Sequence, residues 1–393
     1  MTDVFMNTYH RLPVSFVRGE GAWLFDGGGN KYLDFGSGIA VNCLGHAYPP
    51  LVKAIADQAA RLNHVCNYYQ NDVTAAFAER LVAACAPAGM RRVFLANSGA
   101  EANEGAVKIA RKYSLLRHGA NRHRIVTLRG SFHGRTITTL SATGQDVFHK
   151  DFGPFTEGFS YIPAGDAEAL DRALDGDTVA GFLVEAVQGE GGVRPLDSGY
   201  IERAAKLCAE RDILLIFDEI QCGLGRTGSF LACEAYNLKP DLVTLAKGLA
   251  GGIPVGAVLA GDKAADVLQV GDHASTFGGN PVAAAAGLVV LETVTQKPFL
   301  DEIARKGEKL RSALRGWKRP GIKDIRGRGL IIGIDIEGEA WPLLERAITR
   351  AAAGTPGLLL LSAGKNTLRL LPPYIISDAE LDLGLEILRE LLS

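Results

Sequence analysis

The sequence lacks the features that mark secreted, membrane-spanning and nucleic-acid-binding proteins. Its six cysteines are scattered and form no C-x-x-C pair, which argues against both a zinc site and a disulfide framework. No uninterrupted apolar run reaches the ~18 residues that a membrane-spanning helix needs, and residues 1–4 lack the basic start and apolar run of a signal peptide. The formal net charge of −2 gives no electrostatic basis for binding nucleic acid or an anionic membrane. We therefore expect a protein of a reducing, cytoplasmic setting.

What the sequence does contain is enough apolar material for a large core. Hydrophobic residues make up 47% of the chain and charged residues 22%, which is ordinary for a soluble globular protein. A length of 393 residues favours one large domain with a smaller one beside it. The 47 glycines show no repeat period and gather in loops after predicted strands, where a ligand can approach the backbone closely.

An alternation of apolar strands and helical spacing begins near residue 51 and predicts the fold class. Strands are expected at 92–96, 124–128, 181–187, 213–218, 242–246 and 255–260, with helices at 101–117 and 200–211 between them. This order predicts an α/β fold with a doubly wound, mostly parallel sheet. We expect an N-terminal meander at 1–50 that is part of a small domain, a large domain at 51–284, and a small α+β domain at 285–393.

Two of the predicted strands run straight into a charged residue. The segment 213–217 leads into Asp218, and the segment 242–246 leads into Lys247. A charge at the end of an apolar strand costs several kcal/mol of desolvation unless something pairs it, and ligands of open parallel sheets bind at those carboxyl ends. Pyridoxal phosphate fits, because an Asp stabilises its ring nitrogen as a cation and its aldehyde condenses with a Lys. A structural ion pair between Asp218 and Lys247 explains these two residues equally well.

Loops after other predicted strands carry further candidates. Ser98 begins a helix, where free backbone N–H groups form an anion site, although a Ser at this position is also an ordinary N-cap. Phe132 could lie flat on a cofactor ring and Arg135 could present its fork to a carboxylate, or the two could be a core Phe and a surface Arg. We expect His133 to be structural, because no second ligand is in reach.

The remaining loops offer similar choices. Glu185 and Glu190 flank a Gly-rich loop and could face substrate or be solvated turn formers. Ile220 falls on the same side of its strand as Asp218 and could pack on a cofactor ring, and Gln221 could reach the phenolic oxygen of that ring. The hydroxyls of the loop at 273–281 could bind phosphate or cap the helix that Pro281 opens.

Read together, six segments resemble those of the class III pyridoxal-phosphate aminotransferases, and the resemblance runs from about Tyr9 to the closing helix. The segments are 97–101, 130–136, 188–192, 218–221, 244–248 and 275–281. Within the class the chain is most similar to the acetylornithine aminotransferases, in the stretches 17–21, 38–42, 132–136 and 254–257. The resemblance implies fold type I, the aspartate aminotransferase type, and a homodimer with active sites at the subunit interface.

The resemblance also implies a role for each matching position of the cofactor site. Lys247 would be the Schiff-base lysine and proton carrier, Asp218 would hold the pyridine nitrogen, Gln221 the phenolic oxygen, and Phe132 would stack on the ring. Three residues would bind the cofactor phosphate, namely Gly99, Ala100 and, from the neighbouring subunit, Thr276.

Four further positions match residues that hold substrates. Arg135 and Ser275 stand where the acetylornithine enzymes hold the acylated substrate. Arg369 matches the arginine that grips an α-carboxylate, and Glu190 matches a glutamate that can pair with that arginine. We also expect three residues near the entrance: Tyr9, Asn67 and Tyr68. No metal is needed for this chemistry.

The implied reaction moves the terminal amino group of N-acetylornithine to 2-oxoglutarate, giving N-acetylglutamate 5-semialdehyde and glutamate, a step of arginine biosynthesis. Ornithine aminotransferases carry a Tyr near the position of Gly38 and Ile39, and the small or aliphatic residues here favour an acylated donor over free ornithine. Succinylornithine, succinyl-diaminopimelate and ornithine remain alternative donors, because a small difference in an acyl pocket is worth only ~1–3 kcal/mol. Two other classes remain: a pyridoxal-phosphate aminomutase, against which Arg369 argues, and a cofactor-free binding protein, against which Lys247 and Asp218 argue.

Overall fold

The large sheet of the protein is seven-stranded and mostly parallel. The computed structural model describes residues 4–393. The strand order is β4-β12-β11-β10-β7-β5-β6, and the strands are β4 (Met90–Ala96), β5 (Arg124–Leu128), β6 (Phe159–Ile162), β7 (Val179–Val184), β10 (Leu214–Asp218), β11 (Leu242–Leu245) and β12 (Gly256–Gly261). Within this described sheet, β12 is the one strand that runs opposite to the other six. The predicted doubly wound sheet is confirmed.

Helices cover both faces of this sheet, and the strands supply apolar side chains to each. The helix α4 (Gly99–His118) packs on β7, β10, β11 and β12 on one face, whereas α7 (Ser198–Glu210) contacts β10 and α3 (Asp72–Cys85) contacts β4 on the other. In β10, Leu214 and Ile216 join the core cluster beneath α4, and Leu215 and Phe217 join the larger cluster on the opposite face. Because successive side chains of a strand alternate between faces, a strand buried on both sides has to be apolar throughout.

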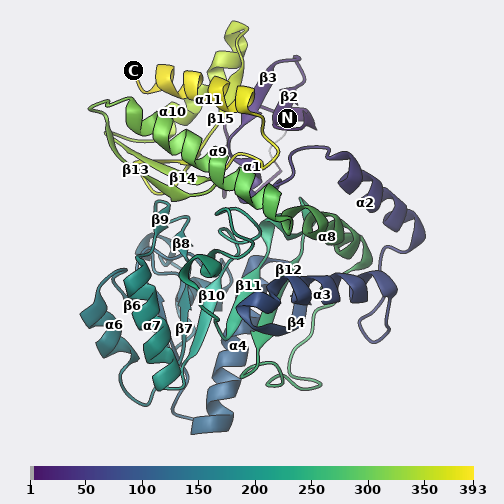
Figure 1. Ribbon diagram of the computed structural model, residues 1–393, viewed down its shortest axis with the longest axis vertical. Coiled ribbons are helices and arrows are strands. Elements are labelled where there is room, and N and C mark those ends of the chain that lie inside the picture. Colours follow the sequence, from purple (N-terminus) through teal and green to yellow (C-terminus); the bar gives the residue numbers. More distant parts are fainter. Residues whose placement is uncertain (1–3) are drawn as a thin grey trace.

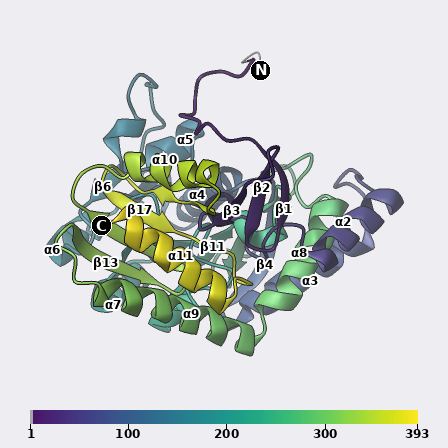
Figure 2. The same ribbon diagram turned by 90° about the horizontal axis from the view of Figure 1, so that it is seen from above.

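A smaller antiparallel sheet is built from the C-terminal part of the chain. It has the order β13-β14-β17-β16, from β13 (Ile322–Arg328), β14 (Ile331–Ile336), β16 (Leu361–Ser362) and β17 (Thr367–Leu370). Three helices accompany it, namely α9 (Lys297–Gly316), α10 (Trp341–Thr349) and α11 (Asp378–Leu391). Figure 1 shows these green to yellow elements above the large sheet, and Figure 2 shows the helices from above.

The N-terminal meander packs with this C-terminal part. The strands β1 (Phe16–Glu20), β2 (Trp23–Asp26) and β3 (Lys31–Asp34) are antiparallel, and β15 (Gly357–Leu359) pairs with β3 in parallel. Trp23 Nε1 also donates a hydrogen bond of 2.6 Å to Glu380 Oε1 in α11. Both views place the purple strands beside the yellow helix. The division into three parts at residues 50 and 284 stays a prediction.

The connection between the two sheets runs through the helix α8 (Pro281–Val294). Asn280 Oδ1 caps it by accepting from the backbone N–H of Ala283 at 3.0 Å, and Pro281 occupies its first turn, as predicted. The helix α2 (Pro49–Arg61) packs against α8 at the edge of the molecule. Within residues 4–393, no helix is both long and apolar enough to cross a membrane.

Candidate active site

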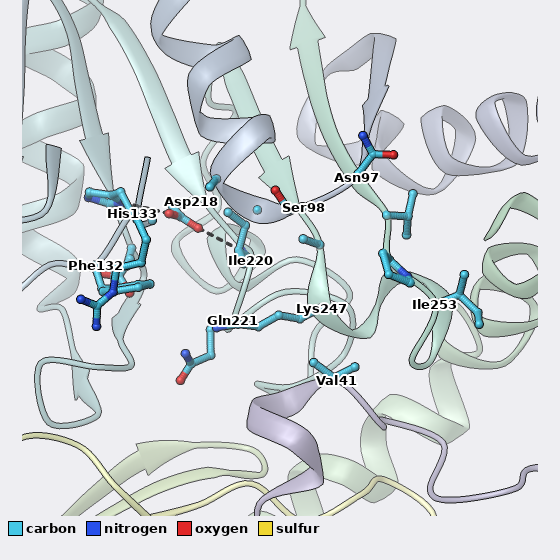
Figure 3. Close-up of a pocket in the computed structure, with 18 of the residues that line it drawn as sticks. Val41, Asn97, Ser98, Phe132, His133, Asp218, Ile220, Gln221, Lys247 and Ile253 are labelled. Carbon is cyan, nitrogen blue, oxygen red and sulfur yellow. Dashed lines mark hydrogen bonds and ion pairs between the residues drawn. The ribbon is translucent and has the colours of Figure 1, made fainter. Parts of the chain in front are cut away.

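A cavity of about 430 Å³ opens at the carboxyl ends of the parallel strands. Loops that follow β4, β5, β7, β10 and β11 form its wall. These loops bring together most of the predicted site residues, namely Gly99, Ala100, Phe132, Arg135, Asp218, Ile220, Gln221 and Lys247. Figure 3 shows Phe132 and His133 on one side of the cavity, Lys247 and Gln221 near its centre, and Asn97 on the far side.

Asp218 is buried at the end of β10 and is held by three hydrogen-bonding groups. Its Oδ2 lies 2.8 Å from His133 Nδ1 and accepts from Asn103 Nδ2 at 2.8 Å, and its Oδ1 accepts from the backbone N–H of Ile220 at 3.0 Å. Within residues 4–393, Asp218 forms its ion pair with His133 and none with Lys247. The interpretation of Asp218 and Lys247 as a structural ion pair is therefore wrong. The other interpretation, that a ligand binds between the two residues, remains.

Two residues of this site, His133 and Asn103, contact Asp218 in a way that the sequence did not reveal. The structural role expected for His133 stays a prediction; its Nδ1 contacts the carboxylate of Asp218, and its Nε2 is buried without a hydrogen-bond partner in the described chain. Asn103 lies on α4 among small apolar residues and also accepts from Thr244 Oγ1 at 2.8 Å. A signal was present, because a polar side chain on a helix face made of Ala and Val needs a buried partner.

Lys247 follows β11, and its side chain is half-buried in the cavity wall. Its φ of +47° lies in the left-handed region, which costs a residue with a Cβ atom about 1 kcal/mol or more. Burial lowers the pKa of its amine, and the nearby Arg369 lowers it further, against the opposing charges of Glu190 and Asp218. A lowered pKa leaves a larger share of the amine neutral at neutral pH, and the neutral amine is the form that attacks carbonyl groups and accepts protons.

The N-terminus of α4 forms one end of the cavity. Ser98 caps the helix, since its Oγ accepts from the backbone N–H of Glu101 at 3.2 Å, and it also lines the cavity beside Gly99 and Ala100. A Cβ atom on Gly99 would lie 2.9 Å from the side chain of Ile220, so only glycine fits there without displacement. This helix end presents backbone N–H groups and the positive end of a helix dipole, which together bind anions.

The loops after β5 and β7 are joined by a buried carboxyl. Glu185 accepts from the backbone N–H of Phe132 at 3.0 Å and from that of Gly189 at 3.3 Å. Burial, then the charge of Asp218, raises the pKa of Glu185 well above its ordinary value. Of the two alternatives for Glu185, the solvated turn former is wrong, because its buried side chain connects the loop that carries Phe132 to the loop that carries Glu190.

Arg369 lies on β17 and is buried next to the cavity wall. Its Nη1 donates to Glu190 Oε1 at 2.5 Å and to Gln221 Oε1 at 2.9 Å, and Gln221 Nε2 donates to Glu190 Oε1 at 3.2 Å. Burial alone would raise the pKa of Glu190, but the charge and hydrogen bond of Arg369, with help from Lys247, bring that pKa below its ordinary value. The ion pair between Glu190 and Arg369 is thus present as expected, with Gln221 between it and the cavity.

Comparison with known proteins places this arrangement in a family. The family model described as aminotransferase class-III matches residues 4–392. This chain is a class III aminotransferase. It is 46% identical to the acetylornithine aminotransferase of Caldanaerobacter subterraneus subsp. tengcongensis over 391 residues, which cover 99% of this chain and 97% of that protein. The predicted family is confirmed.

Solved structures agree with the assignment. A structure of the ornithine aminotransferase from Toxoplasma gondii, described with partial occupancy of PLP at its active site, has a TM-score of 0.93 at 35% identity and covers 99% of this aminotransferase and 92% of that chain. The N-acetylornithine aminotransferase from Stenotrophomonas maltophilia has a TM-score of 0.84 at 38% identity, covering 98% of this chain and 96% of that chain. The predicted fold type is confirmed.

The aminotransferase uses pyridoxal phosphate, and its cavity fits this cofactor. Gly99, whose missing Cβ atom leaves room for Ile220, begins α4, and the free backbone N–H groups of this helix end can hold a phosphate. Asp218 is fixed as an acceptor that can hold a ring nitrogen, and the amine of Lys247 faces the same space. Ile220 and Phe132 supply apolar surface for a ring between these groups. The individual roles of these residues stay predictions.

Two predicted residues of the aminotransferase lie apart from the main cavity within this chain. Ser275 and Thr276 line a second cavity of about 460 Å³, and Thr276 is exposed. Asn97 borders both cavities, and its Nδ2 donates to Ser275 Oγ at 3.1 Å. The roles of Ser275 in substrate binding and of Thr276 in a neighbouring active site stay predictions.

The residues expected at the entrance do not line the main cavity of this chain. Asn67 Nδ2 donates to the backbone carbonyl of Ser275 at 2.9 Å, so it supports the loop of the second cavity. Tyr9 and Tyr68 are 73% and 94% exposed. Their place at an entrance stays a prediction.

Proposed function

We propose that this enzyme transfers the terminal amino group of N-acetylornithine to 2-oxoglutarate, with pyridoxal 5′-phosphate as cofactor. The products are N-acetylglutamate 5-semialdehyde and glutamate, and the reaction belongs to arginine biosynthesis. The similarity to curated acetylornithine aminotransferases, at 44–47% identity along the whole chain, supports this donor.

The observation that carries the proposal is a pair of arginines in different surroundings, one in the cavity wall and one buried next to it. Arg369 is buried and paired with Glu190, whereas Arg135 lines the cavity wall and is exposed. Two arginines suit two substrates that both carry carboxylates but react through different amines. An aminomutase does not accept 2-oxoglutarate and would have no use for the second arginine.

The chain's own residues prepare the chemistry. When bound, pyridoxal phosphate supplies an aldehyde that condenses with amines and a ring that accepts the electrons of a broken C–H bond. Asp218, oriented by His133 and Asn103, is placed to keep the ring nitrogen protonated. Lys247 accepts and returns the proton of the donor carbon, a task that its lowered pKa favours.

Glu190 and Arg369 adapt one site to both substrates. N-acetylornithine reacts through its terminal amine and brings no carboxylate to Arg369, so Glu190 provides the counter-charge in that half-reaction. Glutamate must place its α-carboxylate on Arg369, and Glu190 must then leave. Its Gly-rich loop, with Gly192 at a φ of +106°, has the backbone freedom for this movement.

The segment before the first large-domain helix favours an acylated donor. Gly38 and Ile39 have φ of +61° and +65°, and Val41 of the same segment lines the main cavity. None of these side chains offers a hydroxyl that would hold the free α-amine of ornithine. The methyl of an acetyl group, by contrast, can pack on an apolar side chain such as Val41.

We further propose that two copies of the chain share their active sites in the cytoplasm. The exposure of Thr276, together with that of the neighbouring Phe277 at 60%, supports a subunit contact at this loop.

Half-reaction spectroscopy tests the proposal. The purified holoenzyme is mixed with N-acetylornithine, succinylornithine, succinyl-diaminopimelate or ornithine, and the change in cofactor absorbance is followed in single turnovers. We expect N-acetylornithine to react with the highest ratio of rate to apparent dissociation constant. A higher ratio for ornithine would overturn the proposed donor, and absence of any reaction with glutamate would overturn the proposed acceptor.

A further inference from the structure

Arg135 packs against two aromatic rings and has no acidic partner. Its guanidinium carbon lies 4.0 Å from the ring centroid of Phe148 and 5.5 Å from that of Phe132. Within residues 4–393, no carboxylate lies at ion-pair distance from it. Its charge is therefore balanced by ring faces rather than by an anion of the chain, which leaves it available for an anionic ligand.

Phe148 contacts Arg135 more closely than Phe132 does, and it is not one of the predicted site residues. It ends the short 3₁₀ helix η2 (Asp146–Phe148), is half-buried, and meets Phe132 edge to face with centroids 5.8 Å apart. The three side chains thus form one cluster at the wall of the cavity, with the guanidinium over the face of Phe148.

Hydrogen bonds tie the segment of Phe148 to the loop that carries Phe132. The backbone N–H of Gly144 donates to Ser131 Oγ at 3.1 Å, and Gln145 Nε2 donates to the Ser131 carbonyl at 3.0 Å. Phe148 is consequently fixed relative to the cavity wall, and a ring in a fixed place can orient a long, exposed side chain that would otherwise sample several rotamers.

Stacking uses the face of a guanidinium and leaves its edges free. The N–H donors of Arg135 point outward in the guanidinium plane, so a stacked Arg135 can still bind a carboxylate with two parallel hydrogen bonds. We propose that Phe148 is a positioning residue that holds Arg135 for the carboxylate of the amino donor and so sets the preference for donors that carry one. The inference rests on the proposed function for the identity of that donor.

Two donors that differ only in the carboxylate provide the test. N-acetylornithine is compared with N-acetyl-1,4-diaminobutane, which has the same acylated chain and reactive amine but no carboxylate. In single-turnover half-reactions, Phe148→Leu should raise the apparent dissociation constant for N-acetylornithine about two- to fivefold. This is the change expected when a partly exposed cation–π contact is lost. The constant for N-acetyl-1,4-diaminobutane should not change.

Matched variants separate positioning from a general structural role. Phe148→Tyr keeps the ring and should behave as wild type with both donors. Phe155→Leu removes a half-buried ring of the same segment that contacts His149 and not Arg135, and it should also leave both constants unchanged. In an Arg135→Ala background, Phe148→Leu should have no further effect on N-acetylornithine, because the group that it positions is gone.

Two outcomes would overturn the inference: an equal loss with both donors, or the same loss with N-acetylornithine in the Arg135→Ala background. Failure of the proposed function looks different, since wild type would then react poorly with both acylated donors. In that case the comparison is repeated with ornithine and 1,4-diaminobutane, and a carboxylate-dependent loss in Phe148→Leu would still support the positioning role.

Discussion

Removing the carboxylate of Glu190 should make the enzyme bind glutamate better. Glu190 is half-buried and paired with Arg369, which is only 2% exposed, and the α-carboxylate of glutamate must displace it. A charge-assisted hydrogen bond is worth about 1.5–3 kcal/mol. Because Glu190 is partly in contact with solvent, the lower value applies, and Glu190→Ala should lower the apparent dissociation constant for glutamate about tenfold.

The other half-reaction should respond in the opposite direction. N-acetylornithine brings no carboxylate to Arg369, so in Glu190→Ala it must bind beside a buried arginine that has lost its counter-charge. We expect its half-reaction to be slower or unchanged. The measurement is stopped-flow absorbance of the holoenzyme with each substrate in turn, for wild type, Glu190→Ala and Arg369→Ala. The last variant should lose far more with glutamate than with N-acetylornithine.

Glu190→Gln is the matched control, because an amide keeps the shape and a hydrogen bond but removes the charge. Its effect on glutamate should lie between wild type and Glu190→Ala. The lowered pKa of Glu190 keeps its carboxylate ionised across neutral pH. Glu190 therefore competes fully with glutamate for Arg369 above the ordinary pKa of a glutamate side chain, and this competition is lost only as the pH falls through the lowered pKa. If Glu190→Ala and Arg369→Ala slow both half-reactions equally, the pair is only structural.

Four further predictions concern three residues of the cofactor site and one buried carboxyl beside it. Lys247→Ala should fold and hold the cofactor without a covalent bond but complete no turnover, and repeated turnover without added amine, measured by product formation, would contradict this role. Asp218→Asn should retain the cofactor yet lose about 100-fold or more in single-turnover rate, and a near-normal rate with a lowered melting temperature would contradict a role in the chemistry. Thr276→Val should lose cofactor more readily on dilution, as absorbance after gel filtration will show, and a loss independent of concentration would place Thr276 outside the site. Burial raises the pKa of Glu219 from 4.5 to about 7. Its contribution to stability is therefore full below the pKa of the unfolded chain and is lost as the pH rises through about 7. The melting temperature of wild type should fall more between about pH 5 and pH 8 than that of Glu219→Gln, and an equal fall in both proteins would refute the raised pKa.

The sequence predicted the large sheet because its signal is local. Each strand buried on both faces is a continuous apolar run, and β5 has the predicted bounds Arg124–Leu128. Strand direction carries no such signal: the apolar run of β12 looks the same whether it is parallel or antiparallel, and it is antiparallel. The pairing of β3 with β15 joins segments at opposite ends of the chain, and no local pattern predicts such a partner.

The candidate site was predictable where a charged or polar residue follows an apolar strand. Asp218 ends β10 and Lys247 follows the adjacent strand β11, so their placement in the wall of one cavity follows from sheet geometry. The contacts of Asp218 with His133 and Asn103 depend on how a loop and a helix pack over the sheet, and residue spacing does not determine that packing. Phe148 was missed for the same reason, because an aromatic in a loop has many places to pack.

Several costly features of the fold lie at this cavity or next to it. Lys247 has a left-handed backbone, Glu185 is buried with a raised pKa, and Arg369 leaves its Nε without a hydrogen-bond partner in the described chain. Each such feature costs about 1–3 kcal/mol, and some also occur elsewhere in the described chain, as at Arg226, whose Nε and Nη2 are buried without a hydrogen-bond partner. Lys247 and Glu185 line one cavity together with a helix N-terminus, and Arg369 lies behind Gln221. We propose that a cofactor that carries an anion, a basic nitrogen and an aldehyde supplies partners for the helix N-terminus, for Asp218 and for Lys247 at once.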